Sequence, residues 1–280
     1  MFKTDDGVEL SYEVQGDGVP VVLANGLPDT KAGWRETAEA LARYFRVVTF
    51  DLRNQGPVQN GGDGYDMERH VRDFTQLLDH LAIDRFVGVG LSMGARLLAD
   101  FAGSEGERAL RLVLIGASSD RLAPRYRAIF KSWLRALEAA PSDDLTPFVE
   151  AFVTWAFDPA FFSRDPDFFS RYAKLLAATQ SRGGLGANIA AMIKSYEFDY
   201  VRKFRLKPIA ARTRFIQGEF DFLTPPQFLR EMVEIFPHSS LAVIPGCGHN
   251  IRVTEPLRLQ QEILDFLIRD DELMEYDDEH

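Results

Sequence analysis

The sequence predicts an α/β fold, a mostly parallel central sheet with helices on both faces and a helical segment inserted into it. Two observations lead to this prediction. Short, almost continuous apolar runs, the pattern of strands buried on both faces, recur at 19–24, 46–51, 85–90 and 110–115. Segments of helical periodicity separate these runs, and strands that alternate with helices form a parallel sheet covered on both sides.

The first half of the chain gives the clearest periodicities. Apolar residues at every second position predict one strand with one buried face over Val8, Leu10, Tyr12 and Val14. Helical spacing follows twice, first at Trp34, Ala38, Leu41 and Ala42 and then at Val71, Phe74, Leu78 and Leu81. The run at 85–90 leads directly into a third predicted helix at 93–102.

No convincing buried strand occurs between 121 and 206, where helical spacing at Phe130, Trp133, Leu134 and Leu137 predicts a helix face. The alternation then resumes with strands at 213–218 and 241–245 and helices at 227–236 and 256–268. We therefore predict an α/β core formed by 1–120 and 207–280, with 121–206 as an inserted helical cap.

Composition narrows the class of protein. The chain has 280 residues, with 32 Lys and Arg against 42 Asp and Glu, for a net charge of −10. Such an acidic surface disfavours nucleic-acid binding, and much of the excess lies in a predicted solvated tail at 270–280. The sequence has no uncharged apolar stretch of about 18 residues, so we predict no membrane span. The single cysteine, Cys247, and the lack of an apolar leader favour a cytoplasmic protein.

A candidate nucleophile lies where the third of the buried runs meets a helix. Gly90-Leu91-Ser92-Met93-Gly94 follows the apolar run at 85–90 and opens the predicted helix at 93–102. This strand–turn–helix setting is that of a nucleophile elbow, in which a tight turn presents the serine. Flanking glycines leave room where helix and strands crowd the turn. We predict that Ser92 is the nucleophile.

A serine needs a base, and the base needs an acid to orient it. His249 follows the last predicted strand, and loops at that edge of a parallel sheet are where sites gather. The other four histidines, His70, His80, His238 and the tail residue His280, are expected on the surface. Asp221 follows the preceding strand, and the order Ser92, Asp221, His249 is that of α/β-hydrolases. Glu219 is the competing acid.

The oxyanion of an acyl-transfer intermediate needs two preorganised donors. The backbone N–H of Met93, next to the nucleophile, is one candidate. The loop Asn25-Gly26-Leu27-Pro28 follows an early strand, and proline has no N–H, so Leu27 is the expected second donor. The side chain of Asn25, beside it, is a candidate substrate contact.

Five motifs in this order resemble those of the α/β-hydrolase superfamily, over nearly the whole chain. Members often show His-Gly-x-Pro, Asp-x-Arg-Gly-x-Gly, Gly-x-Ser-x-Gly-Gly, Gly-x-x-Asp and Gly-x-Gly-His. Here asparagine replaces the first histidine, and alanine replaces the final glycine of the third motif. The serine differs from the aspartate of haloalkane dehalogenases and epoxide hydrolases. The matching segments are Asn25-Gly26-Leu27-Pro28, Asp51-Leu52-Arg53-Asn54-Gln55-Gly56, Gly90-Leu91-Ser92-Met93-Gly94-Ala95, Gly218-Glu219-Phe220-Asp221 and Gly246-Cys247-Gly248-His249.

The resemblance implies the α/β-hydrolase fold and a serine hydrolase of esters or thioesters, acting on a small-molecule or carrier-linked acyl substrate. Carbon–carbon hydrolase and cofactor-free perhydrolase chemistry use the same three residues, and a non-catalytic small-ligand binder is the alternative of another class. No metal or cofactor is expected, and the oligomeric state stays open. The predicted cap holds close to half of the aromatic residues, which either pack the cap or line an apolar pocket; the candidate pocket residues are Trp133, Phe152 and Trp155.

Overall fold

Seven strands form one central sheet in the computed structural model. The structure describes residues 1–280 except 57–60, 119, 142–143, 198–208 and 269–280, so the acidic tail lies outside the described residues. The strand order is β3-β5-β4-β6-β7-β8-β9, with β3 antiparallel to β5 and the other neighbours parallel. The strands span Tyr12–Gln15 (β3), Pro20–Ala24 (β4), Arg46–Phe50 (β5), Phe86–Leu91 (β6), Ala109–Ile115 (β7), Arg212–Gly218 (β8) and Ser239–Ile244 (β9).

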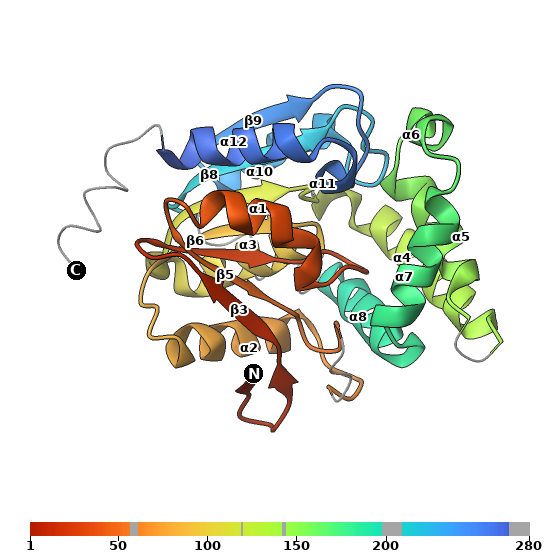
Figure 1. Ribbon diagram of the computed structural model, residues 1–280, viewed down its shortest axis with the longest axis horizontal. Helices are drawn as coiled ribbons and strands as arrows, with labels where there is room; N and C mark the ends of the chain where they lie inside the picture. Colours follow the sequence, from red (N-terminus) through yellow and green to blue (C-terminus); the bar gives the residue numbers. More distant parts are fainter. Residues whose placement is uncertain (57–60, 119, 142–143, 198–208, 269–280) are drawn as a thin grey trace.

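Helices cover both faces of this sheet, which confirms the predicted fold class. One apolar cluster packs α1 (Arg35–Leu41) and α12 (Pro256–Ile268) against one face. Another packs α2 (Met67–His80), α3 (Met93–Glu105) and α10 (Met232–Ile235) against the other. Figure 1 shows α1 and α12 on one side of the strands and α2 on the other. Buried on both faces, β4, β6 and β7 have the near-continuous apolar sequences expected of parallel strands.

Five helices follow β7 and form a layer at one end of the sheet, shown in green in Figure 1. Between β7 and β8, the described residues form no strand. We call α4–α8 the helical layer; the division of the chain into a core and a cap at 121–206 stays a prediction. Aromatic side chains fill the layer, among them Phe148 and Trp133, with ring centroids 6.1 Å apart. The helices are α4 (Ala123–Ala139), α5 (Thr146–Ala156), α6 (Pro159–Arg164), α7 (Phe168–Thr179) and α8 (Arg182–Ser195).

Two expected elements differ from the prediction. The alternating segment near the start is not one strand: β1 (Phe2–Lys3) pairs with β2 (Glu9–Leu10) in a small separate sheet, and β3 begins only at Tyr12. Alternation fails at Val14, which is 40% exposed, because β3 is an edge strand with little packed on its outer side. The predicted helix at 227–236 is a 3₁₀ segment, Pro226–Glu231, followed by the single-turn α10.

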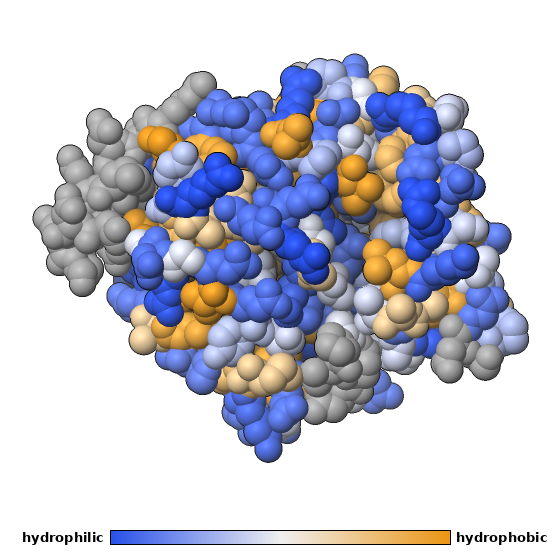
Figure 2. All heavy atoms as spheres, viewed as in Figure 1, coloured by the Kyte–Doolittle hydropathy of each residue, from blue (hydrophilic) through white to orange (hydrophobic). Residues whose placement is uncertain are grey.

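Figure 2 shows a largely hydrophilic face on which apolar patches are small and separated. No helix among the described residues is long and apolar enough to cross a membrane.

Candidate active site

Ser92 lies between β6 and α3 in a backbone conformation that L-residues rarely adopt. Its φ is 54° and its ψ is −108°, and such strain costs on the order of 1–3 kcal/mol. Its N–H donates to Ile115 O at 2.8 Å, and its carbonyl accepts from Arg96 N at 3.0 Å where the helix starts. The residue is partly exposed. This strand, sharp turn and helix form the geometry of a nucleophile elbow.

Close backbone packing around Ser92 requires its two flanking glycines. A Cβ at Gly90 would lie 2.6 Å from the carbonyl carbon of Gly94, and a Cβ at Gly94 would lie 2.3 Å from Ala24 O. Both distances are far below van der Waals contact, so a side chain at either position would push the turn apart. The start of α3 therefore packs directly on the end of β4.

His249 and Asp221 meet at the same edge of the sheet. His249 follows β9 and Asp221 follows β8, and His249 Nδ1 lies 2.8 Å from Asp221 Oδ2. Both residues are buried. A second residue holds the acid, because Thr224 N donates to Asp221 Oδ1 and Thr224 Oγ1 to Oδ2, each at 2.7 Å. Because a carboxylate only accepts hydrogen bonds, the proton of a neutral imidazole is placed on Nδ1.

The other ring nitrogen, His249 Nε2, is buried and makes no hydrogen bond with a described residue. A Ser92–His249 hydrogen bond is thus absent; such bonds are often long in proteins without substrate. Gly116, which follows β7 at φ 59°, supports the ring, since a Cβ there would lie 2.6 Å from His249 Cε1. The carboxyl ends of β6, β7, β8 and β9 thus collect the candidate residues.

Two other side chains in these loops could take part in catalysis, those of Glu219 and Cys247, but each has a different environment. Glu219 is exposed, and its Oε2 accepts from Gly246 N at 3.0 Å, away from the imidazole. Cys247 is fully buried with Sγ 3.4 Å from Ile244 O, and burial raises the pKa of its thiol to about 12. A thiol in that environment stays protonated and is a packed residue rather than a nucleophile.

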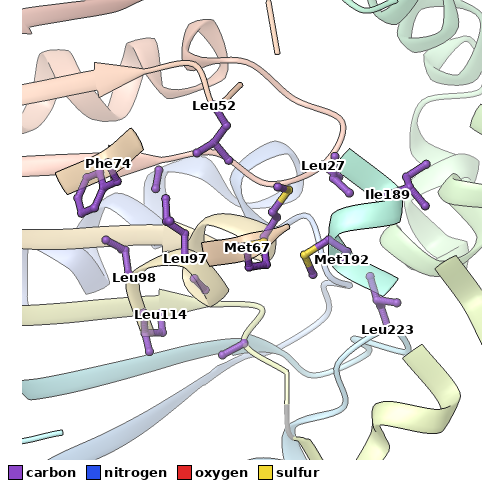
Figure 3. Packing of buried hydrophobic residues seen from close by; sticks show 14 of the residues in the cluster. Leu27, Leu52, Met67, Phe74, Leu97, Leu98, Leu114, Ile189, Met192 and Leu223 are labelled. Carbon is purple, nitrogen blue, oxygen red and sulfur yellow. The ribbon is translucent and has the colours of Figure 1, made fainter. Parts of the chain in front are cut away.

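The loop after β4 lies against the nucleophile. A Cβ at Gly26 would be 3.2 Å from Ser92 Cβ and 3.1 Å from Leu91 O. Leu27 is buried, and Figure 3 shows it close to Ile189 of α8, within one apolar cluster that also contains Met93. The two expected oxyanion donors, Leu27 and Met93, thus belong to segments that flank Ser92.

Two amides hold this loop, one of which the sequence did not single out. Asn25 is fully buried, and its Nδ2 donates to Phe50 O at 2.8 Å, so its side chain is committed to the sheet edge. Gln55 accepts from Leu52 N at 3.2 Å and donates through Nε2 to Gly26 O at 3.2 Å. Gln55 lies in the second motif of the resemblance, which was the only signal for it.

The same motif carries buried charges with a structural role. Asp51 accepts from Lys31 N at 2.7 Å, and burial raises the pKa of its carboxyl. Arg53 donates to both oxygens of Asp73, at 2.8 and 3.0 Å, and to Asp6 at 2.9 Å. These contacts tie the loop after β5 to α2 and to the start of the chain.

The candidate pocket residues pack within the helical layer. Trp133 is 1% and Phe152 is 2% exposed, with ring centroids 5.3 Å apart, and Trp133 Nε1 donates to Ala151 O. Trp155 is partly exposed, and the Arg125 guanidinium lies 5.0 Å from its ring centroid. These contacts favour packing over a pocket wall for Trp133 and Phe152.

One histidine differs from its expected placement. His70 lies on the buried side of α2, fully buried, with the Tyr65 ring edge-on at 5.0 Å; the prediction of a surface position is wrong. Its place on the helix, one turn before Phe74, is the signal that could have indicated burial. His80 and His238 are exposed as expected. Among the described residues, no group of His, Cys, Asp and Glu side chains could hold a metal ion.

A family model described as the alpha/beta hydrolase fold matches residues 19–256. The chain is an α/β-hydrolase. The match runs from the start of β4 to the start of α12 and so includes the nucleophile elbow and both loops that carry Asp221 and His249. The family resemblance inferred from the five motifs is confirmed.

Relatives of this α/β-hydrolase span nearly its whole length. One relative, from Agrobacterium fabrum, is named as a carbamate hydrolase. It is 26% identical to this chain, over 94% of this chain and 100% of its own length. The 2-hydroxy-6-oxo-2,4-heptadienoate hydrolase of Pseudomonas putida is 26% identical, over 95% of each chain. A solved thermophilic esterase from Thermogutta terrifontis is 26% identical with a TM-score of 0.79, over 95% of each chain.

Proposed function

We propose that this protein is a serine hydrolase that cleaves carboxylic esters or thioesters of small, apolar or aromatic substrates. The observation that carries the proposal is the buried His249–Asp221 hydrogen bond of 2.8 Å, at the same sheet edge as the strained Ser92. Asp221 fixes the imidazole so that the lone pair of Nε2 is available as a base. The esterase from Thermogutta terrifontis, similar over 95% of the chain, supports the same chemistry.

In the proposed mechanism His249 Nε2 takes the Ser92 proton while Oγ attacks the acyl carbon. The carbonyl oxygen becomes an oxyanion that accepts hydrogen bonds from the N–H groups of Leu27 and Met93. His249 then gives its proton to the leaving alcohol or thiol as the acyl–oxygen or acyl–sulfur bond breaks. Water, deprotonated by His249, then attacks the acyl carbon. As the bond from the acyl carbon to Oγ breaks, His249 returns the proton to Ser92 and the acid is released. Asp221 stabilises the imidazolium in both halves and stays ionised.

A panel of p-nitrophenyl esters and acyl-thioesters of graded chain length tests this proposal. Ser92→Ala is expected to lower kcat by about 10⁴-fold or more, and mass spectrometry after treatment with a fluorophosphonate is expected to show one adduct on Ser92. Ser104→Ala, on the same helix with its hydroxyl bonded to the Asp100 and Phe101 carbonyls, is the matched control and retains both. Full activity in Ser92→Ala, or an adduct elsewhere, refutes the proposal.

Carbon–carbon bond hydrolysis is the second candidate, favoured by the similarity to the Pseudomonas putida enzyme. It uses the same serine and base but releases a carbon leaving group that must be protonated as the bond breaks. Assay of a 2-hydroxy-6-oxodienoate beside the ester panel separates the two. A kcat/KM at least tenfold higher for the dienoate than for every ester assigns carbon–carbon cleavage.

A further inference from the structure

A part-buried ion pair joins the loop after β4 to the segment that follows His249. Asp29 directly follows Pro28, and Arg252 lies on α11 (Ile251–Thr254), three residues after His249. Arg252 donates through one terminal nitrogen to Asp29 Oδ2 at 2.5 Å, and the two side chains are 6% and 11% exposed. The pair therefore links the candidate oxyanion loop to the candidate base across 223 residues of sequence.

Each member of the pair is held on further sides. The Arg252 guanidinium lies 5.1 Å from the Trp34 ring centroid and against Gly33, where a Cβ would be 2.0 Å from its other terminal nitrogen. Asp29 Oδ1 lies 3.5 Å from the Tyr172 hydroxyl of α7. The pair lines a cleft of about 480 Å³ between α1, α7 and α12, on the face shown in Figure 2. A rotation of either side chain would therefore break its contacts, those of Arg252 with Trp34 and Gly33 or that of Asp29 with Tyr172.

Asp29 also closes the turn that carries Leu27. Its N–H donates to Gly26 O at 3.1 Å, so that Gly26, Leu27, Pro28 and Asp29 form one hydrogen-bonded turn. A displacement of the Asp29 side chain would be passed to the Leu27 amide, two residues earlier. Donors at an oxyanion site act only when they are preorganised, and a misplacement of about 1 Å can cost about 100-fold in rate.

We propose that Asp29 and Arg252 are positioning residues that set the Leu27 N–H relative to His249. This inference rests on the proposed function, because it assigns the pair to the oxyanion site of that reaction. A pair this little exposed suits the role because loss of either partner leaves a poorly solvated charge without its counter-ion. In this role both residues act through the loops that carry Leu27 and His249.

The test uses the full chain and a p-nitrophenyl ester as substrate. Phenylboronic acid is the second probe, because addition of Ser92 Oγ to its boron would give a tetrahedral adduct. Asp29→Asn is expected to lower kcat and boronate affinity together by about tenfold or more, with KM within about threefold, because only the tetrahedral state needs the oxyanion donors. Arg252→Gln gives the same pattern, and the double variant loses no more than either single one. Glu262→Gln, at the more exposed Arg214–Glu262 pair, leaves both quantities unchanged.

The outcomes separate this inference from the function on which it rests. Wild-type protein that neither hydrolyses the ester nor binds the boronate overturns both. Wild-type protein that does both, while folded Asp29→Asn matches it or loses only KM, overturns the positioning role alone. If Asp29→Asn does not fold, Arg252→Lys replaces it, because lysine keeps the positive charge but lacks the planar guanidinium. Parallel losses in kcat and boronate affinity in that variant support the positioning role, and wild-type values refute it.

Discussion

Stability should fall between about pH 6.5 and pH 4 because His70 is buried in its neutral form. Its side chain is fully buried on α2, and this burial lowers its pKa from 6.5 to about 4. In that window the unfolded chain binds a proton that the folded chain refuses, so stability is lost as pH falls. At 1.36 kcal/mol for each pKa unit, the loss reaches about 3 kcal/mol near pH 4.

Urea unfolding of wild type and His70→Phe between pH 4 and pH 7 measures this loss. Phenylalanine keeps a planar ring in the site and cannot titrate there, so the variant is expected to lose about 3 kcal/mol less than wild type across the window. Asp51 changes stability in the opposite direction as pH falls, because burial raises the pKa of its carboxyl. It is present in both wild type and His70→Phe, so it does not contribute to the difference between them. His80→Phe, at an exposed position of the same helix, is the matched control. Equal pH slopes in wild type and His70→Phe would refute the reasoning.

Three further substitutions act on the site and its support. Gly116→Ala should lower kcat by about 100-fold, because the new Cβ would lie 2.6 Å from His249 Cε1 and displace the ring; steady-state ester kinetics measure it. Gln55→Leu removes the hydrogen bond to the candidate oxyanion loop and should lower kcat/KM by about tenfold. Arg53→Met leaves Asp73 Oδ2 without the Arg53 donor while Arg69 still pairs with Oδ1, and it should cost about 2 kcal/mol of unfolding free energy, measured in urea.

Controls for these substitutions come from positions that lack the relevant contact. Gly183→Ala meets nothing within 4 Å and should leave kcat unchanged. Gln261→Leu loses only an exposed bond to Asp265, and Arg214→Met, at a more exposed ion pair, should cost less than about 1 kcal/mol. Wild-type kcat in Gly116→Ala, wild-type kcat/KM in Gln55→Leu, or a cost for Arg53→Met no larger than that for Arg214→Met would contradict the corresponding prediction.

Periodicity and local turn chemistry were enough to predict most of the sheet. Strands such as β4, β6 and β7 are buried on both faces, and burial on both faces is written in the sequence as an uninterrupted apolar run. The misread elements are those whose environment is set by distant segments. Val14 lies on an edge strand, and His70 belongs to a helix whose buried side also holds Phe74. Polarity alone placed His70 at the surface, whereas packing between α2 and its neighbours placed it inside.

The candidate residues Ser92, Asp221 and His249 were named from the sequence because each lies in the segment that follows a strand, and parallel strands bring their carboxyl ends to one edge. Their surroundings depended on the tertiary structure. Thr224 on Asp221, Gly116 under His249 and the Asp29–Arg252 pair are contacts between loops. No periodicity encodes such contacts, because loop conformations arise only when the sheet and the helical layer have packed. The sequence by itself determined which strands along the chain the candidate residues follow, and the fold decided what holds each group in place.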